Sequence, residues 1–272
     1  MKVKIVSDSA SNLFELPGVD YGFVPLKIIS PTQEYVDTPE LDLDGMISDL
    51  QKAKGPTRTS CPNAYEWAQA FEGAEYVFAV TITSNLSGSC SAAMQAASER
   101  DNAYVVDTLS AGPEIQLIIE KLRDLVLEGH DFERIKAMIQ DYMTHTHLLF
   151  SLESLTNLAR NGRVSPAVAK IAGVLGLRLV GKASDVGTLE PMHKVRGEKK
   201  AIATIYNEML TAGYQGGKVC IAHCQNPDAA KALEALIRKD HPHAPIVMVP
   251  CTALCSFYAE SGGLLVGYED LY

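Results

Sequence analysis

The strongest constraint on the fold is an alternation of short apolar runs with segments of helical periodicity. Residues 76–82 read YVFAVTI, which is typical of a buried strand, and the alanine-rich residues 89–99 follow as a helix. The other predicted elements of this half are strands at 4–7, 23–29 and 104–106 and helices at 43–52, 64–71, 115–128 and 132–145. Such β–α alternation predicts a Rossmann-like parallel sheet with helices on both faces.

The second half continues as α/β with a different strand arrangement. Two strands at 178–183 and 188–193 turn at residues 185–187, which predicts an antiparallel pair. The remaining expected elements are strands at 148–151, 218–223 and 246–249 and helices at 155–159, 166–175, 199–211 and 227–239. We therefore expect two domains, an N-terminal α/β domain over 1–147 and a C-terminal α/β domain with a mixed sheet over 148–272. No low-complexity linker separates them, so we expect them to pack closely.

Charge and hydropathy exclude several classes of protein. The net charge is −9 and no cluster of Lys and Arg stands out, so a nucleic-acid partner is not expected. The acidic balance also argues against docking on anionic membranes, and no apolar run reaches the roughly 18–20 residues of a membrane span. The first residues, MKVKIVSDSA, lack the apolar core of a signal peptide. We expect a soluble, cytoplasmic protein without stable membrane insertion.

The cysteines do not predict a disulfide scaffold or a metal site. Cys220 and Cys224 flank His223, and Cys251 and Cys255 repeat the spacing, but structural zinc usually shows a tighter two-residue spacing. Free cysteine is among the most buried residue types, so we expect buried, reduced thiols and no metal.

Two hydroxyl-rich loops lie where ligands bind on a parallel sheet. The first covers residues 57–62 (TRTSCP) and the second residues 83–89 (TSNLSGS), each just before a helix. Hydroxyls and unpaired N–H groups at helix starts attract anions, and Gly88 lets N–H groups converge. For a single loop of this kind, helix capping is the favoured explanation. Two on one sheet favour an anion site.

A Ser-dependent acyl hydrolase or transferase acting through Ser87 is the enzymatic alternative. Neither loop has the G-x-S-x-G elbow of such enzymes, and none of the seven histidines stands out as a base. No P-loop or dinucleotide-binding fingerprint is present. We therefore expect no catalytic residues and no cofactor.

Several short motifs, in this order and spacing, resemble the DegV family, which includes the fatty-acid-binding subunits of bacterial fatty acid kinase. The resemblance spans essentially the whole chain. The matching segments are 7–9 (SDS), 24–26 (VPL), 35–37 (YVD), 59–62 (TSCP), 86–89 (LSGS) and 155–165 with its Gly-Arg turn (GRVS at 162–165).

The resemblance implies that a long-chain fatty acid lies between the two domains and that its carboxylate is presented to the catalytic subunit of a fatty acid kinase. Arg163, in the Gly-Arg turn, would compensate the carboxylate or face the kinase, although a surface ion pair is the plain alternative. The carboxylate-binding residues implied are Thr59, Ser60, Ser87, Gly88, Ser89, Arg163 and Tyr258.

The chain departs from the family pattern near residue 258. The family often has a histidine before Gly-Pro-Gly-Ala that contacts the carboxylate, and Tyr258 takes that position here. A phenol still donates a hydrogen bond but carries no positive charge. The alternative that the chain binds another small anionic lipid therefore stays open. The apolar segment 166–177 would line the acyl tunnel or pack in the core.

Overall fold

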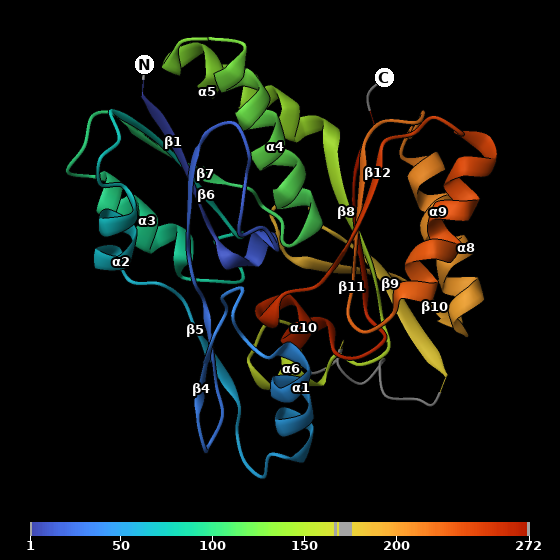
Figure 1. The fold of residues 1–272 in the computed structure, drawn as a ribbon. Coiled ribbons are helices and arrows are strands. Elements are labelled where there is room, and N and C mark those ends of the chain that lie inside the picture. The colour runs from blue at the N-terminus through green and yellow to red at the C-terminus, as the bar shows by residue number, and fades with distance from the viewer. Residues whose placement is uncertain (1, 166–167, 169–175, 271–272) are drawn as a thin grey trace.

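The computed structural model describes residues 2–165, 168 and 176–270. The helix expected over 166–175 and most of the apolar segment 166–177 lie outside the described residues. Figure 1 shows two α/β layers side by side, with α4 between their sheets and a small third sheet below.

The first sheet is parallel, and its described strands run in the order β2-β1-β6-β7. Their bounds are Asp20–Val24, Val3–Asp8, Tyr76–Thr81 and Ala103–Asp107. Alternate residues face opposite sides, so Ile5 packs in one apolar cluster with α4 and Val6 in another with α2 and α3. The helices around this sheet are α2 (Ala64–Ala70), α3 (Ser89–Ala97), α4 (Pro113–Leu127) and α5 (Phe132–Tyr142). This confirms the expected Rossmann-like arrangement.

The second sheet is mixed, with its described strands in the order β10-β9-β8-β13-β11-β12. Only the β11–β12 pairing is parallel among these. The bounds are β8 (Thr146–Leu152), β9 (Leu177–Ala183), β10 (Leu189–Arg196), β11 (Val219–His223), β12 (Ile246–Pro250) and β13 (Leu264–Glu269). Helices α8 (Glu198–Thr211) and α9 (Pro227–Asp240) cover one face, and α4 packs on the other.

A small antiparallel sheet joins the two halves. It contains β3 (Lys27–Ile29) between β4 (Glu34–Val36) and β5 (Arg58–Ser60). Its apolar residues share one core with elements from the second half, because Ile28 lies in the same cluster as Phe150 and Phe257. The helices at this junction are α1 (Leu43–Lys52), α6 (Thr156–Arg160) and α10 (Ala253–Ala259).

The prediction of one continuous strand over 23–29 is wrong. β2 ends at Val24, β3 begins at Lys27, and the two belong to different sheets. Pro25 lies between them, and proline cannot continue a ladder because it lacks the N–H donor. The helix expected over 132–145 ends at Tyr142 and continues as a 3-10 turn, Met143–His145. The division of the chain after residue 147 stays a prediction.

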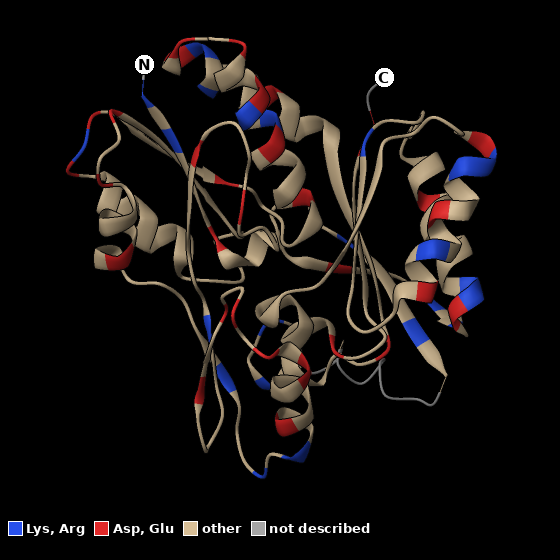
Figure 2. Cartoon of the chain, in the orientation of Figure 1, with Lys and Arg blue, Asp and Glu red and all other residues tan. Residues whose placement is uncertain are grey.

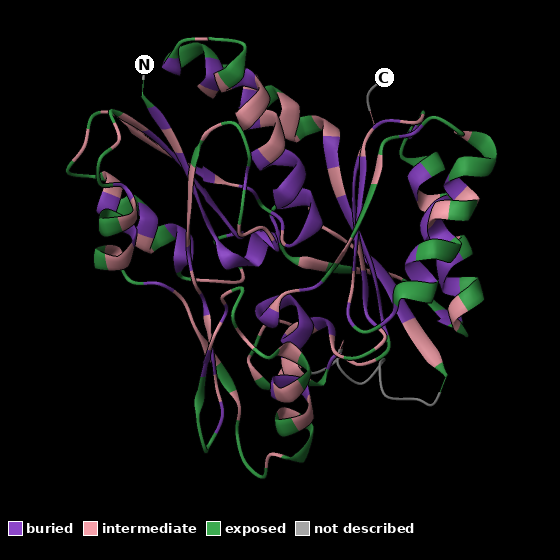
Figure 3. Ribbon diagram, viewed as in Figure 1, coloured by how far each residue is buried: buried purple, intermediate pink, exposed green. Residues whose placement is uncertain are grey.

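Burial and charge follow the layered arrangement. The central strands and much of α4 are buried (Figure 3), and Lys and Arg alternate with Asp and Glu on the outer helices α8 and α9 (Figure 2). Five cysteines are buried as expected, and Cys61 is half-buried. No helix in the described part of the chain has the length and apolar character of a membrane span.

Candidate functional site

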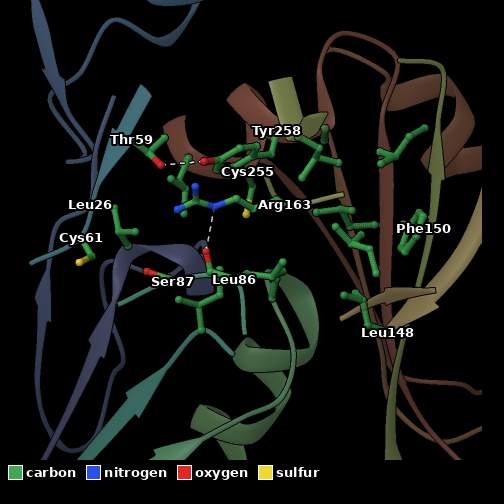
Figure 4. Close-up of a pocket in the computed structure, with 18 of the residues that line it drawn as sticks. Leu26, Thr59, Cys61, Leu86, Ser87, Leu148, Phe150, Arg163, Cys255 and Tyr258 are labelled. Carbon is green, nitrogen blue, oxygen red and sulfur yellow. Dashed lines mark hydrogen bonds between the residues drawn. The ribbon is translucent and has the colours of Figure 1, made fainter. Parts of the chain in front are cut away.

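A cavity of about 320 Å³ lies where the parallel sheet, the mixed sheet and α10 meet. Most of its wall is apolar, and one end is polar (Figure 4). The apolar lining comprises Leu26, Cys61, Ile82, Leu86, Ala111, Leu148, Phe150, Leu152, Leu158, Leu189, Leu254, Cys255, Ala259 and Leu265. An apolar cavity with a few polar groups at one end orients an amphipathic ligand.

The polar end brings together six of the seven predicted site residues from four parts of the chain. They are Thr59, Ser60, Ser87, Gly88, Arg163 and Tyr258. The hydroxyls of Thr59 on β5 and Tyr258 on α10 lie 2.7 Å apart and are hydrogen-bonded (Figure 4). Their bond closes the cavity between the small sheet and α10.

Ser89 does not line the cavity. Its hydroxyl donates to the buried Asp8 carboxylate at 2.7 Å, and its N–H donates to the Ser87 hydroxyl oxygen at 3.2 Å. The Asp8 oxygen that accepts from Ser89 also accepts from the Ile82 N–H at 3.0 Å. Asp8 therefore fixes both ends of the loop that carries Ser87. Because Ser87 accepts from Ser89, its own proton is available to a ligand.

Arg163 brings a positive charge to the polar end. Helix α6 ends in a turn at Gly162, whose φ of +72° is a left-handed conformation that favours glycine. The Nε of Arg163 donates to the Leu86 carbonyl at 3.0 Å (Figure 4), and Nη1 donates to the Asn161 carbonyl. Of the described residues that line the cavity, Arg163 alone carries a charge. The guanidinium has five N–H donors, so donors remain for an anionic ligand.

Asp37 holds α10 in place from the opposite side. Its carboxylate accepts from the N–H groups of Ala253 at 2.8 Å and Leu254 at 3.2 Å, and from the Thr252 hydroxyl at 3.2 Å. Helix starts have unpaired N–H groups, and here a carboxylate distant in sequence satisfies two of them. Asp37 follows β4, so it ties the sheet that carries Thr59 to the helix that carries Tyr258.

Burial raises the pKa values of both supporting carboxyls. The pKa of Asp8 is raised to about 7 by desolvation, although the bonds from Ser89 and Ile82 lower it. Burial likewise raises the pKa of Asp37 to about 6, against the bonds from Leu254 and Ala253. Burial also raises the pKa of Tyr258, while its bond to Thr59 and the charge of Arg163 act in the opposite direction. Tyr258 is therefore a neutral hydrogen-bonding group.

Analysis of the sequence missed Asp8 and Asp37 as supports of the site. Both stand in matched motifs, SDS and YVD, but only the structure gives their contacts. The lining also lacks a partner for catalysis by Ser87. No His, Asp or Glu is among the described lining residues, so none of them is placed to remove the serine proton.

The fold and the site define a class of two-domain α/β proteins that enclose an apolar cavity with a polar end. A family model described as "Uncharacterised protein, DegV family COG1307" matches residues 2–269, so the chain belongs to the DegV family. A DegV domain-containing protein from Streptococcus pneumoniae is 40% identical over 279 residues, which cover 99% of each chain. A similar protein from Streptococcus gordonii is 38% identical with the same coverage.

Solved structures of related proteins superpose over nearly the whole chain. The Streptococcus pneumoniae Fatty Acid Kinase (Fak) B3 protein loaded with linoleic acid is 40% identical with a TM-score of 0.97, and the match covers 100% of both chains. A DegV family protein from Eubacterium eligens loaded with heptadecanoic acid is 38% identical with a TM-score of 0.95, covering 99% of this chain and 100% of that one. Both neighbours carry a fatty acid.

Proposed function

We propose that this protein binds one long-chain fatty acid in the interdomain cavity and presents its carboxylate to the catalytic subunit of a fatty acid kinase. The observation that carries the proposal is the polarity of the cavity, which is apolar except at an end with hydroxyls and one arginine. The fatty acids bound by the relatives from Streptococcus pneumoniae and Eubacterium eligens support the same ligand class.

Burial of the acyl chain supplies the binding energy. An acid of 16–18 carbons has about 15–17 alkyl carbons, and burying each stabilises the complex by about 0.8 kcal/mol, so the total is about 12–14 kcal/mol before the costs of association. The leucines of the lining and Phe150 offer the apolar wall that such a chain requires.

We assign the carboxylate to the polar end. The hydroxyls of Thr59 and Ser87 and the N–H of Gly88 would donate to it, and Arg163 would compensate its charge. Ser60 and Tyr258 border the same end, with Tyr258 as a neutral donor where the family has histidine. Ser89 would act indirectly, through its bonds to Ser87 and Asp8.

The partner would perform the phosphoryl chemistry. Gly88 and the neighbouring Ser84 and Asn85 are exposed, so the polar end lies close to the surface where a kinase approaches. The sequence has no phosphate-binding loop of its own. A carrier that serves an ATP-dependent kinase would work in the cytoplasm.

Native mass spectrometry of the purified protein, followed by lipid extraction, tests the proposal. We expect one fatty acid per chain, lost when Thr59→Ala and Ser87→Ala are combined. The matched control combines Thr57→Ala with Ser84→Ala, which removes two hydroxyls of the same loops that do not line the cavity, and it should retain the acid. Protein that stays empty after incubation with acids of 14–18 carbons contradicts the proposal.

An ester-hydrolysis assay of the same variants separates a carrier from an acyl hydrolase or transferase. The carrier predicts no turnover. Ester turnover that disappears in Ser87→Ala would assign Ser87 as a nucleophile and reject the carrier function.

A further inference from the structure

A small apolar pocket of about 30 Å³ adjoins the main cavity beside Leu148 and Phe150, which lie opposite Thr59 and Tyr258 in Figure 4. The two cavities share five lining residues, Leu86, Ala111, Leu148, Phe150 and Leu189. The exposed surface of this distal pocket is entirely apolar. A single water needs about 10–15 Å³ of such volume, so the distal pocket has room for one or two carbon atoms.

The turn between β9 and β10 closes the distal pocket from the second domain. Gly187 in this turn has a φ of +75°, and a Cβ there would lie 2.9 Å from the Cα of Leu109 and would clash with the Thr83 hydroxyl. The Asn85 amide donates to the Val186 carbonyl at 2.6 Å, which ties the turn to the loop that carries Ser87. The pocket wall is therefore built by both domains and is tightly packed.

Leu148 lies between the two apolar cavities and a larger one. It lines the main cavity, the distal pocket and a third cavity of about 700 Å³. That third cavity is bordered by ionisable side chains, including Glu114, His147, Lys182 and Glu208. The Leu148 side chain therefore forms part of the wall between the two apolar cavities and this larger space, so truncating it would give a longer acyl chain room to extend.

Resting on the proposed function, we propose that the distal pocket receives the methyl end of the acyl chain and that Leu148 sets the longest acid the protein accepts. In Figure 4 Leu148 and Phe150 lie opposite the pair of Thr59 and Tyr258, so a chain anchored at the polar end runs toward them. Each further methylene that the pocket accommodates strengthens binding about fourfold, and a chain that is too long must bend or leave its head group misplaced.

The test measures the affinity of saturated acids of 12–22 carbons for wild type, Leu148→Ala and Leu152→Ala. Leu152 is the matched control, because it is buried on the same strand and lines the main cavity but neither the distal pocket nor the third cavity. We expect Leu148→Ala to move the optimum to acids longer by one to three carbons. Leu152→Ala should weaken all lengths by a similar factor and leave the optimum in place.

A variant that fills the distal pocket with a larger side chain provides the opposite test. Ala183 lines the distal pocket and the third cavity but not the main cavity, so Ala183→Leu should weaken the longest bound acid at least tenfold and leave shorter acids unchanged. An unmoved optimum in both Leu148→Ala and Ala183→Leu, or an identical shift in Leu152→Ala, overturns the assignment. Wild-type protein that binds no acid of any length refutes the proposed function and this inference with it.

Discussion

Replacing Asp8 by asparagine should make the protein more stable at pH 8. The side chain is fully buried at the end of β1, and one of its oxygens accepts from both Ile82 and Ser89. The other oxygen, Oδ1, has no hydrogen-bond partner among the described residues. Asparagine keeps the accepting oxygen and removes a buried charge.

The size of the effect follows from the pKa of Asp8. Burial raises it from 3.8 to about 7. A carboxyl with a raised pKa contributes stability that is fully present below pH 3.8 and is lost as the pH rises through about 7. Each pH unit between these values lowers the free energy of unfolding by about 1.4 kcal/mol, or about 4 kcal/mol in all. The unpaired amide of the asparagine itself costs about 1–3 kcal/mol. We therefore expect the free energy of unfolding at pH 8 to rise by about 1–3 kcal/mol in the variant.

Denaturant unfolding of wild type and Asp8→Asn between pH 5 and 8 measures the effect. Wild type should lose stability as the pH rises, and the variant should show a flatter profile. Asp8→Ala is the control, because it removes the charge together with both hydrogen bonds and leaves the Ile82 N–H unpaired. A variant that is less stable than wild type at pH 8, or that keeps the wild-type slope, refutes the reasoning.

Three further substitutions test the polar end. Tyr258→Phe removes the bond to Thr59 and should weaken fatty acid binding about 3–10-fold in a displacement assay, whereas unchanged affinity would exclude Tyr258 from the head-group site. Arg163→Gln should weaken binding of an acid at least about tenfold but not that of the alcohol of equal length; equal losses for both would mean that Arg163 acts through packing. Asp37→Ala leaves two N–H groups of α10 without an acceptor and should lower the free energy of unfolding by about 2–5 kcal/mol, and a melting temperature equal to wild type would contradict this.

The sequence predicted best the elements whose apolar periodicity extends over many residues. The strand at Tyr76–Thr81 and the helix at Ser89–Ala97 differ by only one or two residues from their predicted ranges, since apolar periodicity decides both. The loop between them was therefore correctly placed at the carboxyl edge of the sheet, and Ser87 and Gly88 with it. The resemblance to the DegV family added Arg163 and Tyr258, which no periodicity would have brought to the same cavity.

The short elements were not predicted because their partners are distant in the chain. β5 is three residues long and pairs with β3, which lies about 30 residues earlier. Helix α10 was not predicted either, since seven residues without a capping side chain of their own give no helix signal, and its start depends on Asp37. The buried position of the Ser89 hydroxyl likewise depends on its bond to Asp8, which is 81 residues away.

The place of β13 in the mixed sheet has a consequence for synthesis on the ribosome. This strand, Leu264–Glu269, lies between β8 and β11, so the middle of the sheet stays open until residue 269 has been added. The parallel sheet is complete about 160 residues earlier, at Asp107. At 5–20 residues per second the nascent chain waits about 10–30 s with one wall of the cavity formed and the other incomplete. On the proposed function, ligand capture is therefore a late event of synthesis, and a chain interrupted before β13 would expose the apolar wall that the finished protein encloses.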